Sequence, residues 1–348
     1  MRGLIAAAAV VLMSLTACST GPAGGAGGAG GQSAAATDQF PVTVEHAFGE
    51  TVIEEQPERV ATVSWVNSDV ALALGVVPVG MPKEDWGGNE NGSTPWRDAK
   101  LEELGAAIGS ENAPTLYSEV DGIAFDEVAE LAPDVILAAY SGLTQEDYDT
   151  LSKIAPVIAY PEAPYGTDWQ DSTRMIGQAL GLSQQAEDLV AQTEQTIVAK
   201  ASEYPQLAGK SFIYGNLEPA KGDGVNIYTA NDNRPKFLTS IGMVQADVVT
   251  EATKDSAEFF IPWSAEKANE LASDVFVTWV PDDKTAQQIT TDPLLGQIPA
   301  IKDDALVADS DNTLTLSISA ASPLSLPWAL DTFLPMLGKA ADAADAAK

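Results

Sequence analysis

Hydrophobic residues in this chain fall into short continuous runs and into segments with helical spacing. Residues 135–140 form a continuous apolar run, and residues 275–279 form a second one that contains a single polar residue, Thr278. Such runs are typical of parallel strands covered on both faces. Residues 183–204 place apolar side chains three to four positions apart, and Pro205 ends the pattern. This segment predicts one helix about 31 Å long. The order of the elements indicates an α/β protein whose two halves are joined by that helix.

One sequence pattern occurs twice, at residues 126–135 and 266–275. Both copies contain Glu-Leu-Ala, then one further residue and Asp-Val, and both immediately precede or enter an apolar run. We interpret each copy as a short helix, a breaker and a strand. Because both copies occupy the same place in the α/β order, they predict two related lobes.

The elements divide the chain into an N-terminal lobe at 42–182, an interlobe helix at 183–204 and a C-terminal lobe at 205–348. In the first lobe, Asn67 or Ser68 is expected to cap a helix that closes at Gly75, and Thr144 is expected to cap another. Residues 42–49 alternate as an N-terminal hairpin strand does.

The N-terminus predicts export. After Arg2, residues 4–17 are apolar and uncharged, a stretch that suits a secretory signal peptide at 1–17 and is short for a membrane span. The segment Leu15-Thr16-Ala17-Cys18 resembles the lipobox of bacterial lipoproteins, which would make Cys18 the diacylated N-terminus. An ordinary signal peptide with a chance cysteine is the alternative. Residues 18–41 are expected to form a flexible linker at the extracytoplasmic face of the cell membrane.

Composition excludes several function classes. The formal net charge of −32 argues against nucleic-acid binding. His46 is the one histidine and Cys18 the one cysteine. The chain therefore cannot form a zinc site of His or Cys ligands, or a Ser-His-Asp triad anywhere away from His46. An envelope hydrolase that uses a carboxylate pair stays possible, although nothing singles out such a pair.

An ordered set of motifs resembles the iron-siderophore substrate-binding lipoproteins of bacterial ABC importers. The resemblance implies two Rossmann-like α/β lobes joined by a single long helix, a ferric siderophore as the ligand, an ABC permease as the partner, a monomer, and neither cofactor nor catalysis. Haem or cobalamin delivery is the alternative within the class. The motifs lie at residues 46–49, 57–60, 71–80, 141–148, 151–156, 176–181 and 321–331.

A bulky and often anionic iron chelate needs guanidinium donors and aromatic faces. We expect Arg97 and Arg234, which lie in polar loops, to contact the chelate from opposite lobes, and Arg59 and Arg174 to be structural. Strand-end and loop aromatic residues are the other candidates, although such residues can equally close the core. Ser322 could add a polar contact. The aromatic candidates are Trp65, Trp96, Tyr140, Tyr214, Tyr228, Trp263 and Trp279.

The repeat also marks a second site. Asp126 and Glu266 share one repeat position, in the first turn of each expected helix, where an acid stabilises the helix N-terminus. The resemblance implies that one acid in each lobe docks onto arginines of the permease. Glu127, next to Asp126, could serve instead in the first lobe.

Overall fold

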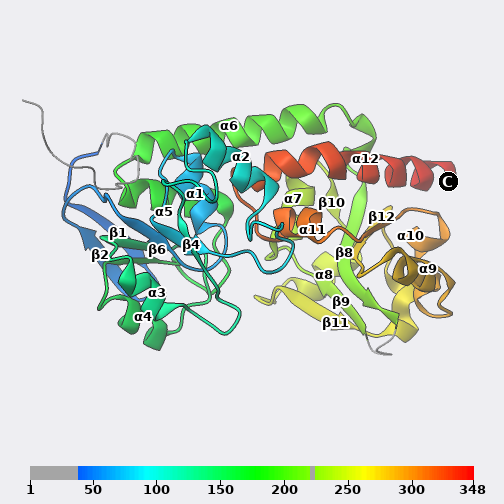
Figure 1. Cartoon of the computed structure of the whole chain (residues 1–348). Helices are drawn as coiled ribbons and strands as arrows, with labels where there is room; N and C mark the ends of the chain where they lie inside the picture. Colours follow the sequence, from blue (N-terminus) through cyan, green and yellow to red (C-terminus); the bar gives the residue numbers. More distant parts are fainter. Residues whose placement is uncertain (1–37, 220–223) are drawn as a thin grey trace, which may run out of the picture.

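The computed structural model describes residues 38–219 and 224–348. The expected signal peptide at 1–17 and the lipidation site Cys18 lie outside these residues. Two α/β lobes lie side by side, and the helix α6 (Ser183–Ala201) runs along both of them (Figure 1). The fold class predicted from the sequence, two Rossmann-like lobes joined by one long helix, is confirmed.

The N-terminal lobe combines a hairpin with a five-stranded parallel sheet in the order β5-β4-β3-β6-β7. The hairpin consists of β1 (Val42–His46) and β2 (Gly49–Ile53). The sheet strands are β3 (Val60–Thr62), β4 (Gly80–Pro82), β5 (Thr115–Tyr117), β6 (Val135–Ala138) and β7 (Val157–Ala159). The helices are α1 (Asn67–Ala73), α2 (Pro95–Glu103), α3 (Phe125–Glu130), α4 (Gln145–Leu151) and α5 (Trp169–Ala179).

One of the two predicted helix caps is confirmed. Thr144 and Asp147 form a reciprocal capping box at the start of α4. The expectation that Asn67 or Ser68 caps α1 is wrong, because Val66 occupies the cap position with a left-handed backbone and no side-chain cap bond. The Asn67 amide is instead used inside the lobe, where it binds backbone carbonyls near the ends of β3 and β6.

The C-terminal lobe contains a six-stranded mixed sheet in the order β11-β9-β8-β12-β13, with β10 also paired to β8. Its strands are β8 (Ser211–Glu218), β9 (Gly224–Tyr228), β10 (Val244–Gln245), β11 (Phe260–Trp263), β12 (Val275–Trp279) and β13 (Leu306–Asp309). Its helices are α7 (Asn233–Ser240), α8 (Asp247–Thr253), α9 (Asp283–Thr291), α10 (Pro299–Lys302), α11 (Asn312–Ser319) and α12 (Ser325–Ala346). Short 3-10 turns are η1 (Pro205–Leu207), η3 (Ala265–Glu270) and η4 (Leu295–Gln297).

The aspartate of each copy of the repeat accepts backbone N–H groups at the first strand of its lobe's sheet. Asp134 accepts the backbone N–H groups of Glu58 and Arg59 just before β3, and Asp274 accepts that of Ser211 at the start of β8. The strand that follows each aspartate then pairs in parallel with that same first strand. The second copy differs from our expectation in one respect, since η3 is a 3-10 turn with a non-helical Lys267 rather than an α-helix.

The N-terminal lobe begins earlier than the sequence pattern indicates. The Asp38 N–H donates to the Gly181 carbonyl (3.1 Å), and its carboxylate accepts from the backbone N and Oγ of Ser183 at the first residue of α6. An acid at a helix N-terminus satisfies free N–H groups and interacts well with the helix dipole. Residues 38–41, which we assigned to the linker, are therefore bound to the lobe and to the interlobe helix.

The lobes are also joined through one buried carboxylate, Asp69 in α1. Ser322, which belongs to the C-terminal lobe, donates from Oγ to Asp69 Oδ2 (2.8 Å). Trp96 Nε1 donates to the same oxygen (2.7 Å), and Arg97 Nε donates to Oδ1 (2.8 Å). All four side chains are buried. The carboxylate thus satisfies donors from both lobes at a point where water is excluded.

We expect Asp69→Ala to lower the free energy of unfolding by about 3–5 kcal/mol, the cost of breaking a buried ion pair by removing one partner. Denaturant unfolding followed by circular dichroism measures this loss. Asp331→Ala is the matched control, because Asp331 pairs with Lys200 between α12 and α6 at the surface and should cost no more than about 1 kcal/mol. Equal losses for the two variants would contradict the role given to Asp69.

Candidate ligand-binding site

A cavity of about 520 Å³ lies between the lobes and is lined mainly by aromatic side chains. Its N-terminal wall carries Trp65, Trp86, Tyr140 and Tyr165. Its C-terminal wall carries Asn216, Tyr228, Asp232, Asn233, Arg234, Phe259, Phe260, Trp279, Thr315 and Ser319. A concave, largely apolar cavity with a few polar groups is the usual form of a small-molecule site. We refer to it as the cleft.

Three of the four aromatic rings of the N-terminal wall pack against one another. Trp65 and Tyr140 follow the carboxyl ends of β3 and β6, the edge where open α/β sheets place ligands. The Tyr165 ring lies between them, with its centroid 6.2 Å from that of Trp65 and 5.7 Å from that of Tyr140. Tyr165 packs so closely over Gly142 that a Cβ there would lie 2.4 Å from the ring. The glycine therefore lets the Tyr165 ring sit against the backbone.

The C-terminal wall contains a neutralised arginine. Arg234 donates from Nε and Nη2 to the two carboxylate oxygens of Asp232, at 2.7 and 2.6 Å. Its guanidinium carbon also lies 3.4 Å from the centroid of the Tyr228 ring. Arg234 and Asp232 are the charged residues among those that line the cleft. The described wall consequently has no net charge when both groups are ionised.

The two walls are connected at the polar end of the cleft and across its rim. Asn233 donates to the Tyr140 hydroxyl (3.2 Å) and to the Ser319 carbonyl (2.9 Å). Trp86 and Trp279 come from different lobes, and their ring centroids lie 6.1 Å apart. Asn312 Oδ1 accepts from Trp279 Nε1 at 2.9 Å and so fixes the second of these rings. The ligand surface is therefore assembled by both lobes.

The structure brings together five of the predicted ligand residues, and their role in binding stays a prediction. It also adds residues that the sequence did not single out. Trp86 and Tyr165 lie in glycine-rich or proline-rich loops without periodicity, and Phe259 and Phe260 lead into an edge strand. The one feature of the sequence that could have indicated these four aromatic residues as ligand contacts is that they lie near polar turn residues. The predicted residues that line the cleft are Trp65, Tyr140, Tyr228, Arg234 and Trp279.

The expectation that Arg97 contacts an anionic ligand is corrected by its position. Arg97 is 4% exposed and is bound to Asp69 and, at 3.6 Å, to Glu84. Trp96 and Ser322 are buried in the same Asp69 network and lie outside the cleft lining. In the sequence, Trp96, Arg97 and Ser322 look like residues that could contact a ligand. Their structural role becomes clear only once Asp69 is known to accept their hydrogen bonds inside the protein.

Two other aromatic candidates also lie outside the lining. Tyr214 is buried behind Tyr228, edge-to-face with a centroid distance of 5.9 Å, so it supports the wall rather than forming it. Trp263 ends β11 and donates from Nε1 to the Lys267 carbonyl (3.1 Å). Both residues therefore fit the alternative role of aromatic residues that close the core.

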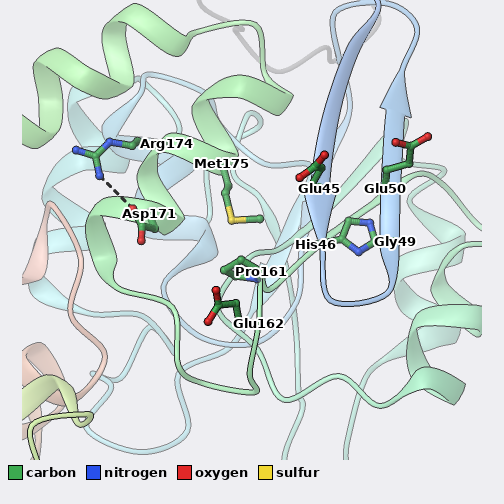
Figure 2. Close-up of a pocket in the computed structure, with 9 residues that line it drawn as sticks. All are labelled: Glu45, His46, Gly49, Glu50, Pro161, Glu162, Asp171, Arg174 and Met175. Carbon is green, nitrogen blue, oxygen red and sulfur yellow. Dashed lines mark hydrogen bonds and ion pairs between the residues drawn. The ribbon is translucent and has the colours of Figure 1, made fainter.

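A second hollow lies beside the β1–β2 hairpin, at His46, Glu50 and Arg174 (Figure 2). His46 is already engaged, because Nδ1 accepts from the Phe48 N–H and Nε2 donates to Thr51 Oγ1 (2.9 Å). Arg174 is paired with Asp171, as the dashed line in Figure 2 marks, and with Glu187. No group of three or more His, Cys, Asp or Glu side chains within residues 38–219 and 224–348 is arranged to hold a metal ion. The cleft is therefore the stronger candidate.

The acids predicted to face the permease are exposed in both lobes. Asp126 and Glu127 lie in the first turn of α3, and Glu266 lies in the first turn of η3. All three side chains belong to exposed residues. None of them lines the cleft, so a ligand in the cleft would not cover them.

Comparisons with known proteins agree with this architecture. A family model described as periplasmic binding protein matches residues 60–313. The chain belongs to the periplasmic binding protein family. It is 24% identical over 282 residues to a probable siderophore-binding lipoprotein, YfiY, of Bacillus subtilis, covering 75% of this chain and 77% of that one. It is 23% identical over 308 residues to the ferric enterobactin-binding periplasmic protein FepB of Escherichia coli, covering 83% and 90%.

The structure is similar to the crystal structure of PiaA from Streptococcus pneumoniae in complex with ferrichrome. The TM-score is 0.79 at 39% sequence identity, and the match covers 87% of this chain and 99% of that one. The resemblance to iron-siderophore substrate-binding proteins of ABC importers is thus confirmed. So is the expectation that the chain is not an enzyme, and the carboxylate-pair hydrolase is no longer an alternative.

Burial raises the pKa of Glu84 to about 7 from its usual 4.5, and Arg97 beside it offsets only part of this effect. Between pH 4.5 and 7 the folded state therefore keeps a proton that the unfolded state releases. Stability is consequently highest below pH 4.5 and falls as the pH rises to 7. Between pH 5 and 8, the wild type should lose on the order of 3 kcal/mol relative to Glu84→Gln, which stays neutral. Denaturant unfolding at several pH values measures the difference. Glu102→Gln, at an exposed position, is the control, and parallel curves for wild type and Glu84→Gln would refute this account.

Proposed function

We propose that this protein captures an uncharged ferric siderophore in the cleft and delivers it to an ABC importer. The observation that carries the proposal is an aromatic cleft whose one arginine, Arg234, is already neutralised by Asp232. Aromatic faces favour a bulky chelate through apolar contact at low conformational cost. The relatives named above support iron-siderophore transport as the setting.

The charge of the wall favours an uncharged chelate over the anionic one that the sequence suggested. An anionic ligand would have to displace Asp232 from Arg234 or add negative charge beside it. Either event removes a charge-assisted pair or creates repulsion in a partly dry site. The formal net charge of −32 adds long-range repulsion. Three hydroxamate groups balance the charge of Fe³⁺, so a ferric tris-hydroxamate meets these conditions, and ferrichrome, the ligand in the PiaA complex, is one.

We expect ferrichrome to bind at least about tenfold more tightly than ferric enterobactin, a trianion, since one unfavourable charge contact is worth roughly 1.4 kcal/mol or more. Quenching of tryptophan fluorescence in titrations with each chelate measures this ratio. Haem and cobalamin complete the panel, because they represent the alternative cargoes of the class. Equal or tighter binding of ferric enterobactin, or preference for haem or cobalamin, would contradict the proposal.

Asp232→Asn provides the matched control for this selectivity. The amide keeps the shape of the side chain and leaves Arg234 with an uncompensated charge, so the affinity for ferric enterobactin should rise while that for ferrichrome changes little. A variant that loses both ligands equally would show that Asp232 acts through folding rather than through charge.

To deliver a siderophore, the protein must be attached to the membrane and must dock onto the permease. We propose that Cys18 carries the lipid that holds the protein at the extracytoplasmic face of the membrane. In the described residues, no helix is both long enough and apolar enough to span a bilayer. We further propose that Glu266, together with Asp126 or Glu127, contacts arginines of the permease. The repeat gives the lobes matching acids, as a two-fold permease would need, and a single copy of the protein then suffices.

We expect Glu266→Ala to leave siderophore affinity unchanged and to reduce siderophore uptake by cells, because the acid is exposed and is not among the residues that line the cleft. Its stability should fall by no more than about 1 kcal/mol, the range for an acid at a helix N-terminus. Uptake of ⁵⁵Fe-ferrichrome by a strain that expresses each variant measures the effect. Glu270→Ala, also exposed and in the same 3-10 turn, is the control; normal uptake with Glu266→Ala would refute the docking role.

A further inference from the structure

Trp65 is held in the cleft by an unusual stretch of backbone between β3 and α1. Ser64 and Val66, its two neighbours, have φ angles of 62° and 58°. The left-handed region is uncommon for residues other than glycine and is a marked outlier for a β-branched residue such as Val66. Between these two residues Trp65 is 45% exposed and lines the cleft. Such a conformation persists only where surrounding contacts over-determine it.

Two side chains supply those contacts. Glu119, in the loop after β5, accepts the Ser64 N–H at Oε2 (2.8 Å). The buried Asn67 amide donates to the Val63 and Trp65 carbonyls (2.8 and 2.9 Å) and accepts the Tyr140 N–H (3.1 Å). Asn67 therefore fixes the loop within its own lobe and links it to the neighbouring strand end. Glu119 reaches the loop from a different segment of the chain.

Glu119 is placed where a carboxyl group is costly. Its second oxygen, Oε1, is buried and has no hydrogen-bond partner among the described residues, and burial raises the pKa of Glu119 to about 7. A half-satisfied buried carboxyl group reduces stability. The contact that Glu119 makes in return is its hydrogen bond to Ser64, the residue that precedes Trp65.

The geometry points to Glu119 as a positioning residue for ligand binding, which holds the Ser64 N–H and thereby keeps the Trp65 ring in the cleft before the chelate arrives. This inference rests on the proposed function for its ligand, but the arrangement of Trp65 can be tested without one. A preformed wall lowers the cost of ordering side chains during binding. Glu119 then affects affinity solely through Trp65.

The first experiment needs no ligand. The protein is labelled with 5-fluorotryptophan, and the Trp65 resonance in the ¹⁹F NMR spectrum is assigned by its absence from Trp65→Phe. Glu119→Ala should shift or broaden that resonance more than those of the other six tryptophans. Glu119→Gln keeps an oxygen acceptor for the Ser64 N–H and should leave the resonance near its wild-type position. An unchanged Trp65 resonance in Glu119→Ala overturns the inference.

The second experiment uses ferrichrome as the probe in a double-mutant cycle. Glu119→Ala should weaken binding about three- to tenfold, the range of a single aromatic contact, and Glu119→Gln should restore most of it. In a Trp65→Ala background, Glu119→Ala should have no further effect. An equal loss in both backgrounds would show that Glu119 does not act through Trp65.

Matched variants distinguish positioning of Trp65 from effects of charge or folding. Asp121→Ala removes an exposed acid two residues from Glu119 and should bind ferrichrome like the wild type, so that a loss there would indicate a general charge effect and overturn the assignment. Should Glu119→Ala fail to fold, Glu119→Leu fills the same space without an acceptor and takes its place. If the wild type does not bind ferrichrome while the ¹⁹F result holds, the proposed ligand is wrong and the positioning role stands.

Discussion

The rest of the structure depends on one buried carboxylate, that of Asp69. It accepts hydrogen bonds from Ser322 in one lobe and from Trp96 and Arg97 in the other. Burying an ion pair stabilises a fold little, but losing one partner is costly, so this arrangement specifies a geometry rather than adding much stability. It joins the two lobes, and α6 runs along both of them (Figure 1). We therefore expect only small changes in their relative orientation.

A fixed interlobe geometry explains the character of the cleft. Lobes that cannot close far around a ligand must present a surface that already fits it. The cleft does so with rings that are held from behind. Tyr165 rests on Gly142, Trp279 is bound by Asn312, and Arg234 is clamped between Asp232 and Tyr228. The wall therefore has a defined shape and no net charge before any ligand is present.

The fold could be predicted from the sequence because it is encoded locally. The apolar runs of β6 and β12, the helical spacing of α6 and the pattern that occurs at both 126–135 and 266–275 each indicate a nearby element. In the structure, Asp134 and Asp274 accept backbone N–H groups at equivalent places in the two lobes. The site could be predicted only in part. Arg97 and Arg234 look alike in sequence, since both follow polar loops, yet one is paired with a distant aspartate inside the protein and the other lines the cleft. The two arginines differ because the fold brings different partners to them, and residue spacing along the sequence does not predict those partners.

The most direct test of this account is a crystal structure of the protein with ferrichrome bound. We predict that the chelate lies between Trp65 and Tyr140 on one side and Tyr228 and Trp279 on the other. The Arg234–Asp232 pair and the Ser322–Asp69 hydrogen bond should both be retained, with lobes that have moved little from the structure described here. A complex in which Arg234 leaves Asp232 to bind the chelate, or in which the lobes rotate and the Asp69 bonds break, would contradict the account.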